Sequence, residues 1–231
     1  MTGQELDDYL AKGWFRMGQT IFTTDFIPVK SSIHPVFWLR FAVKNVNYGK
    51  KQQRLFNTNK GFTVTIQPFL LTEEIEDLYA LYRATIDFDA PPTVESFLLD
   101  GAISSIYDTQ LIEIRDGDRL VAAGIFDNGS NSIAGIMNFF DPAYKSKSLG
   151  KYLMLLKINY AIEFGKEYYY PGYIAGGFSK FDYKLFPDPD AAEIFDVRNE
   201  EWVHLAKVIL PGKIEFKTDN GSETGEEREY N

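Results

Sequence analysis

Residues 141–184 have the sequence DPAYKSKSLGKYLMLLKINYAIEFGKEYYYPGYIAGGFSKFDYK, which carries the strongest signals of fold in the chain. A polar, lysine-rich turn leads at Ser148 into a long apolar segment with helical spacing. Gly165 stands where this helix should end, because glycine readily adopts the left-handed conformation of a C-terminal cap. Aromatic residues at 168–173 then predict a strand, and a glycine-rich turn follows it.

The start of the predicted helix has the chemistry of an anion-binding site. We expect Ser148 to cap a helix that begins at Leu149, and the free N–H groups of a helix start attract anions. A well-capped helix with solvated lysines is the alternative. The turn directly follows a predicted strand, where α/β sheets present ligands, and this favours the anion site. The predicted site consists of Lys145, Ser148, Leu149, Gly150 and Lys151.

The sequence upstream of this stretch predicts a mixed sheet. The expected elements are a strand at 62–69, a helix capped by Thr72, a short helix at 94–100, hairpin strands at 110–115 and 119–127, and a strand at 132–140. Asp116-Gly117 supplies the hairpin turn. We therefore expect an α/β (α+β) fold whose mostly antiparallel sheet is flanked by helices. A barrel is the less favoured alternative, because two long helices are expected.

Three segments are expected along the chain: a small N-terminal subdomain at 1–60, the main domain at 61–216, and a disordered acidic tail at 217–231. In the first, we expect a helix at 4–10 and strands at 20–24 and 38–45. The prolines at 28 and 35 should break the pattern between those strands. A basic segment follows, with Lys50, Lys51 and Arg54, and its charge alone favours a solvated helix face over a phosphate contact.

Composition excludes several classes of protein. The chain has no cysteine, which excludes disulfides and cysteine nucleophiles, and its two isolated histidines do not make a metal site. No apolar stretch is long enough for a membrane helix, and the N-terminus lacks a signal peptide's lysines, so we expect a cytoplasmic protein. A net charge of −9 argues against a surface that binds nucleic acid everywhere, although a local basic cleft is compatible with it.

The order of predicted elements resembles the GNAT acyltransferase superfamily. That superfamily has a pyrophosphate loop of the form Gln/Arg-x-x-Gly-x-Gly/Ala. Here the corresponding residues are Lys145-Ser146-Lys147-Ser148-Leu149-Gly150, with lysine at the first position and serine in place of the first glycine. The match to the CoA-binding members is therefore partial, and a CoA-dependent N-acetyltransferase that uses acetyl-CoA stays as an alternative.

A closer resemblance is to the arginyl-tRNA–protein transferase family and its bacterial leucyl/arginyl relatives. The motifs that carry it are Phe140-Asp141-Pro142, Ser148-Leu149-Gly150-Lys151-Tyr152, Tyr169-Tyr170-Pro171-Gly172-Tyr173, Lys180-Phe181-Asp182-Tyr183-Lys184 and Trp202-Val203. The resemblance is good over about 110–205. It is weaker at 13–18 and 50–59, because the family's N-terminal cysteines are absent and its basic segment is diluted here.

The resemblance implies transfer of an aminoacyl group from aminoacyl-tRNA, as co-substrate, to the α-amine of an acceptor protein's N-terminus, with no other cofactor and no metal. The amine must lose a proton and the developing oxyanion needs donors. The implied catalytic residues are Asp141, Tyr173, Lys180 and Tyr183, and Asp182 is a further candidate base. Implied substrate-binding residues are Gly172 and Lys184, together with the anion site and with Lys50, Lys51 and Arg54 for tRNA.

Each of these residues also has a structural interpretation. Asp141 before a proline is often a turn former, Lys184 could be a solvated end, and glycines often serve loop geometry alone. A binding protein that keeps the fold without catalysis is the third interpretation of the chain.

Overall fold

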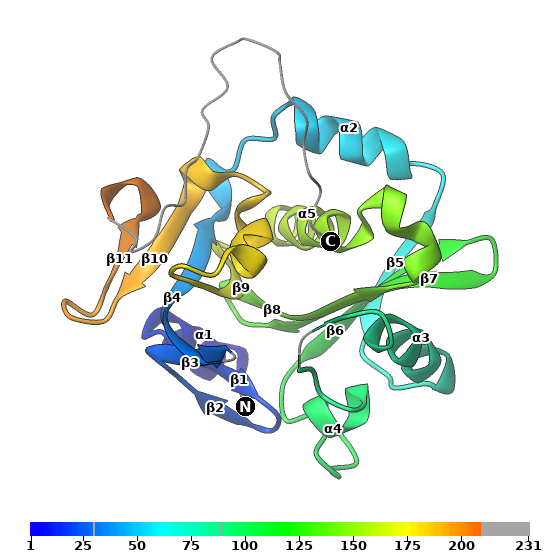
Figure 1. The fold of residues 1–231 in the computed structure, drawn as a ribbon, viewed down its shortest axis with the longest axis horizontal. Coiled ribbons are helices and arrows are strands. Elements are labelled where there is room, and N and C mark those ends of the chain that lie inside the picture. The colour runs from blue at the N-terminus through cyan, green and yellow to red at the C-terminus, as the bar shows by residue number, and fades with distance from the viewer. Residues whose placement is uncertain (30, 88, 209–231) are drawn as a thin grey trace.

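The computed structural model describes residues 1–29, 31–87 and 89–208, and a large twisted sheet forms its centre (Figure 1). The sheet has nine strands. In spatial order they are β11 (Glu201–His204), β10 (Ala192–Asp196), β4 (Ser32–Ala42), β9 (Tyr168–Ala175), β8 (Ser132–Phe140), β7 (Arg119–Asn128), β6 (Thr109–Asp116) and β5 (Thr63–Pro68), with β3 (Phe26–Val29) paired to β4. Among the described strands only β8 and β9 pair in parallel, so the expected mixed, mostly antiparallel sheet is confirmed.

Helices cover both faces of this sheet, as expected (Figure 1). They are α5 (Leu149–Glu163) with α2 (Lys50–Asn59) on one face, and α3 (Glu73–Arg83) with α4 (Val94–Leu98) on the other. The β6 side chains alternate between the two: Leu111 packs with α3, and Ile112 packs with α5. This period of two is what divides the core into two layers. Within the described residues, no helix is both long and apolar enough to cross a membrane.

The predicted helices and the β6–β7 hairpin are confirmed with small shifts of their ends. Thr72 caps α3 by accepting from the Ile75 N–H, and Gly165 follows α5 in the left-handed conformation. Ser148 differs from expectation, because its side chain makes no capping bond. It joins the 3₁₀ helix η2 (Pro142–Lys147) directly to α5, and its left-handed backbone (φ 49°) is not the extended one of a side-chain cap.

The N-terminal strands also differ from expectation. β3 and β4 form a hairpin through both prolines, in which Pro28 pairs with Ile33 and Pro35 with Phe26. Pro28 is tolerated because β3 has a single neighbour, β4, so one side of it needs no ladder bonds. β4 ends at Ala42, and the expected strand to residue 45 is replaced there by a 3₁₀ turn.

The remaining N-terminal elements are α1 (Gly3–Ala11) and the two-stranded sheet of β1 (Phe15–Met17) and β2 (Thr20–Phe22). The segment 1–60 contributes β4 to the large sheet, and its division from the rest at residue 60 stays a prediction. The predicted tail, 217–231, lies outside the described residues.

The parallel pair β8–β9 opens after a short contact, and this opening positions the site. The two strands pair only over three residues each, from Ser132 with Tyr168 to Ala134 with Tyr170. β8 then stays with β7, where the register shifts by one residue opposite Ile125. β9 instead stays paired with β4 from Tyr168 to Ala175, and within it Gly172 has a φ of +95°. The two strands therefore diverge beneath α5.

Candidate active site

A cavity of about 120 Å³ lies where β8 and β9 diverge. The 3₁₀ helix η3 (Ser179–Leu185) contacts both β9 and α5 and closes one side of it. The lining residues are Gly135, Ile136, Met137 and Asn138 of β8, Met154 and Lys157 of α5, Tyr169 and Pro171 of β9, and Tyr183 and Lys184 of η3. The predicted Tyr183 and Lys184 thus come together with residues that sequence analysis did not single out.

Lys184 is held in place by the strand it covers. Its Nζ donates to the Tyr173 carbonyl oxygen at 2.8 Å and lies 4.8 Å from the Tyr173 ring centre and 5.0 Å from that of Phe181. Burial lowers the pKa of Lys184 to about 8. An ammonium group has three donors and only one is used within the described part of the chain, so Lys184 is not a solvated end and can donate to a ligand.

Lys157 is a cation buried inside the apolar helix α5, with 1% of its surface exposed. Its Nζ donates to Ile125 O at 2.8 Å, Met137 O at 3.2 Å and Asn138 Oδ1 at 2.8 Å. Burial lowers its pKa to about 7. Sequence analysis missed it, although helical spacing places Lys157 on the same face as Leu153, four residues before it. A lysine on the apolar face of a helix is the signal that could have found it.

The geometry of β9 beside Lys184 requires a glycine at position 172. Its positive φ is in the region that disfavours a side chain, and a Cβ there would lie 3.2 Å from Lys184 Nζ. The neighbouring Tyr173 packs edge-on against Trp38 and Phe181, with ring centres 5.1 and 5.4 Å away, and burial raises its pKa. Tyr173 is therefore next to the cavity through its backbone carbonyl.

Two acidic candidates have different surroundings. Asp141 is buried, pairs with Arg119 and accepts the Ala143 N–H at 2.9 Å, so both of its oxygens are engaged outside the cavity lining. These contacts are typical of a turn former, and a catalytic role for Asp141 stays a prediction. Asp182 has a buried Oδ1 without a partner in the described part of the chain, and burial raises its pKa to about 6.

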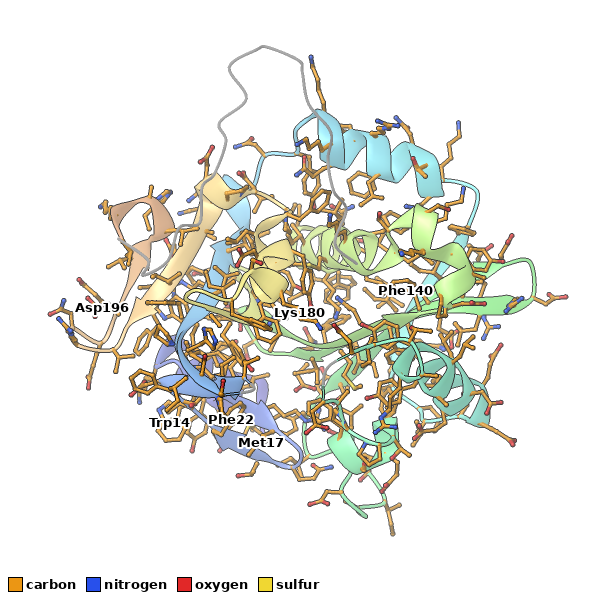
Figure 2. The ribbon with its side chains drawn as sticks, viewed as in Figure 1. Trp14, Met17, Phe22, Phe140, Lys180 and Asp196 are labelled. Carbon is orange, nitrogen blue, oxygen red and sulfur yellow. The ribbon has the colours of Figure 1, made fainter. Side chains whose placement is uncertain are left out.

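Lys180 forms an ion pair with Asp87 and does not belong to the cavity lining. Figure 2 labels Lys180 on η3, in front of the centre of the sheet in this view. Its catalytic role also stays a prediction.

The predicted anion site at the start of α5 lies outside the cavity lining. Lys145, Ser148 and Lys151 are exposed, whereas Leu149 is completely buried and Gly150 is half-buried. Lys151 Nζ lies 5.1 Å from the ring centre of Phe186, which restrains one of these cations. The structure thus leaves three exposed polar or charged side chains at this helix start.

The basic segment forms the exposed face of α2. Lys50, Lys51 and Arg54 are all exposed there. Lys50 and Arg54 line an open groove of about 700 Å³, whose other lining residues are Tyr48, Gly49, Gln53, Asn57 and Thr58. The buried Asn59 donates to Lys147 O at 3.0 Å and fastens the end of α2 to the lysine-rich turn before α5.

Known proteins are similar in sequence to the part of the chain that forms the cavity. Residues 74–191 match the family described as "Arginine-tRNA-protein transferase, C terminus", and this range includes every residue of the cavity lining. The aspartate/glutamate leucyltransferase of Shewanella sp. (strain MR-7) is 33% identical over 192 residues, which cover 79% of this chain and 76% of that protein. That of Thiobacillus denitrificans is 34% identical over 155 residues, or 63% of this chain and 62% of that protein.

Solved structures are similar only at a low level. A GNAT-family acetyltransferase from Novosphingobium aromaticivorans has a TM-score of 0.42 and 14% identity, over 74% of this chain and 64% of that chain. L-PGS from Bacillus licheniformis has a TM-score of 0.44 and 11% identity, over 73% and 49%. At these scores neither structure bears on the chemistry. The sequence match spans the opened sheet and all the residues around its cavity, and by that match the chain belongs to the arginine-tRNA–protein transferase family.

Proposed function

We propose that this protein transfers an aminoacyl group from tRNA to the α-amine of a protein's N-terminal residue, and that the cavity between β8 and β9 receives the aminoacyl ester. One observation carries the proposal: Tyr183 and Lys184, from the family motif, line a cavity that lies wholly inside the family match. The relatives are named aspartate/glutamate leucyltransferases, so leucyl-tRNA and peptides with acidic N-termini are the first substrates to test.

The charge of the residues that line the cavity favours a substrate whose aminoacyl side chain is uncharged. Lys157 and Lys184 both line the cavity, and none of the described residues in its lining is an aspartate or a glutamate. The cationic side chain of an arginyl group would therefore meet two lysine side chains in a partly desolvated space, with no described carboxylate in the lining to pair with it, which is unfavourable. A leucyl side chain meets Met137, Met154 and Pro171 there instead.

The chain supplies a candidate for each step of the reaction. The attacking amine must be neutral. Asp182 precedes Tyr183 and lies outside the cavity lining; it is the candidate to accept the amine's proton, because its pKa is raised and its buried Oδ1 has no partner among the described residues. Lys184 supplies positive charge and free N–H donors beside the ester carbonyl. Tyr183 lines the same wall, while Asp141, Tyr173 and Lys180 are retained as predicted catalytic residues that act from outside the lining.

The test is transfer of labelled amino acid from leucyl-tRNA and arginyl-tRNA to peptides that begin with Asp, Glu or Ala. We expect transfer from leucyl-tRNA to the acidic peptides, and loss of transfer in the variant Lys184→Met. Acetyl-CoA with the same peptides is the matched arm for the acetyltransferase alternative. Acetylation without aminoacyl transfer would overturn the proposal, and so would the absence of any transfer at low salt. The cytoplasmic location stays a prediction, which cell fractionation would check.

We further propose that tRNA lies along α2 and the turn before α5, where Lys50, Arg54 and Lys145 are exposed. Removal of Lys50 and Arg54 together, as Lys50→Ala with Arg54→Ala, should weaken tRNA binding. The slope of log Kd against log salt should fall by about 1 for each phosphate that the variant no longer neutralises. Fluorescence titration from low to moderate salt measures it. Lys12→Ala, an exposed lysine at the end of α1, is the control, and an equal effect there would contradict this placement.

A further inference from the structure

The cavity between β8 and β9 contains amide donors that the described part of the chain does not use. Asn138 lines the cavity, and its Oδ1 accepts from Lys157. None of the described residues accepts a hydrogen bond from Asn138 Nδ2. This atom is also not among the four buried side-chain atoms that lack partners, which are Asn59 Oδ1, Asp127 Oδ2, Asn128 Oδ1 and Asp182 Oδ1. Asn138 Nδ2 is therefore not fully buried, and Asn138 is one of the residues that line the cavity.

Lys157 determines which end of the Asn138 amide faces the cavity. An ammonium ion donates hydrogen bonds and accepts none, so the amide oxygen must face Lys157 and the NH₂ group the other way. The remaining two N–H groups of Lys157 donate to Ile125 O and Met137 O, at the register shift between β7 and β8. All three donors are thus satisfied by the protein, which leaves Lys157 no donor for a ligand.

The neighbouring strand β7 leaves room for the contact between Asn138 and Lys157. A Cβ at Gly124 of β7 would lie 3.2 Å from Asn138 Oδ1 and 2.8 Å from Leu153 Cδ2, which is closer than packed atoms allow. Glycine at this position lets Leu153 of α5 and the Asn138 oxygen approach β7 together. The Asn138 amide oxygen is therefore held from two sides, by Gly124 of β7 and by the ammonium group of Lys157 of α5. A fixed donor of this kind loses little entropy when it binds.

We propose that Asn138 Nδ2 donates a hydrogen bond to the carbonyl oxygen of the aminoacyl ester as that oxygen becomes negative, and that Lys157 is the positioning residue which orients this amide. The inference rests on the proposed function and adds to it a donor that shares the cavity with Lys184. Two kinds of donor then surround one oxygen: an oriented amide on β8 and a cation on η3.

The reaction balances with this assignment. The neutral amine nitrogen bonds to the ester carbon, and the π electrons of the carbonyl move onto its oxygen, next to Asn138 Nδ2. Collapse of the tetrahedral intermediate restores the carbonyl and breaks the bond to the ribose oxygen. The amine loses one proton and the ribose oxygen gains one, so the products are an amide and a free tRNA 3′ end. Asn138 supplies no proton and is unchanged.

The variant Asn138→Asp distinguishes loss of the hydrogen-bond donor from loss of the fold. An aspartate keeps an oxygen for Lys157, so the melting temperature should be preserved, but it replaces the NH₂ group with a second oxygen. Loss of one oxyanion-hole donor from a protease lowers kcat about 10²- to 10³-fold, and we expect a loss of that size here with KM little changed. Asn159→Asp is the control, because Asn159 Oδ1 accepts from Tyr48 and does not line the cavity. Equal kcat values in Asn138→Asp and wild type would overturn the proposal.

A second pair of variants tests the positioning role of Lys157. Lys157→Met should lower kcat in the wild-type background, because the amide is then free to rotate. In an Asn138→Leu background the same change should have no further effect on kcat, because the oriented donor is already gone. A residue that only supports the fold would lower kcat by the same factor in both backgrounds. That result would overturn the positioning role.

A binding measurement distinguishes this inference from the proposed function. The probe is 3′-leucylamido-3′-deoxyadenosine, which carries the carbonyl but cannot transfer its leucyl group. We expect the side-chain ¹⁵N–¹H signals of Asn138 to shift as the probe is added, while those of Asn159 stay in place. If the probe binds without moving the Asn138 signals, or does not bind, the Asn138 role is overturned. If they move but no peptide receives leucine, the proposed function fails and the donor site remains.

Discussion

At the scale of single residues, the site depends on groups whose surroundings change their chemistry. Lys157 and Lys184 are ordinary lysines in the sequence. Burial lowers their pKa values to about 7 and 8, against the opposing effect of the Asp127 charge on Lys157. Tyr183, Lys184 and Gly172 could be predicted from the family motifs. Lys157 could have been noticed as a lysine on the apolar face of a helix. Asn138 could not be predicted, because its importance comes from a contact between β8 and α5 that no local sequence pattern records.

Asp182 should give a pH-dependent stability. Its folded pKa is about 6, above its ordinary value of 3.8, so the charged form is disfavoured in the folded state. This cost is fully present above about pH 6 and disappears as the pH falls towards 4. Asp182→Asn should therefore be more stable than wild type at pH 7, by roughly 1–2 kcal/mol after allowance for solvent, and no more stable at pH 4. Urea unfolding at both pH values measures this, and equal differences would contradict it.

Gly172→Ala should damage both the fold and the site. The φ of +95° strains any other residue, at about 1–3 kcal/mol, and the new Cβ would press on Lys184 Nζ. We expect a lower melting temperature together with a loss of aminoacyl transfer. Gly117→Ala is the matched control, because Gly117 also has a positive φ but nothing lies within 4 Å of its Cβ position. It should lose stability while transfer is retained; a similar loss of transfer in both variants would argue against a role for the Gly172–Lys184 contact.

At the scale of secondary structure, local signals predicted the elements well where one element did not need another. α3 and α4 begin at their threonine caps, and the β6–β7 hairpin turns at Gly117. The predicted elements are wrong where strand pairing overrides the local preference of a residue. Pro28 and Pro35 lie inside a hairpin because β3 needs ladder bonds on one side only. The sequence does not show which strand will lie at the edge of the sheet.

Ser148 illustrates the same limit at a helix start, and it gives a prediction. Its side chain makes no capping bond and its backbone is left-handed, so glycine should fit this position better. Ser148→Gly should raise the free energy of unfolding by about 1 kcal/mol, by relief of the left-handed strain. Ser146→Gly, two residues earlier in η2, should instead be neutral or destabilising. Thermal unfolding of both variants checks this, and destabilisation by Ser148→Gly would show that the serine stabilises the helix after all.

At the scale of the whole molecule, one buried ion pair ties the N-terminal elements to the sheet. Arg16 of β1 donates to Asp127 of β7 at 2.8 Å, to Thr109 at 3.0 Å and to the Leu98 carbonyl at 2.6 Å. Both partners are almost completely buried. This cation lies in the weakly matched segment 13–18, and these three partners are more than 80 residues away in the sequence.

Arg16→Met should be strongly destabilising. It leaves the Asp127 carboxylate buried without its cation, a change that costs about 3–5 kcal/mol. In Arg16→Met with Asp127→Leu, no charge remains and much of that stability should return. Denaturant unfolding of the wild type, both single variants and the double variant measures the coupling. Additive losses would contradict a direct interaction between the two residues.

The sequence by itself determined the elements, their order along the chain and the motifs that mark the family, because caps, turns and apolar periods act over a few residues. The tertiary structure alone decided that β8 and β9 separate after three paired residues on each, that η3 closes the opening, and that Lys157 donates to the Asn138 amide oxygen beside it. The physical reason is the distance along the sequence between the residues that interact. Strand pairing and the burial of a charge depend on residues far apart in the chain, and only the folded molecule brings them within hydrogen-bonding distance.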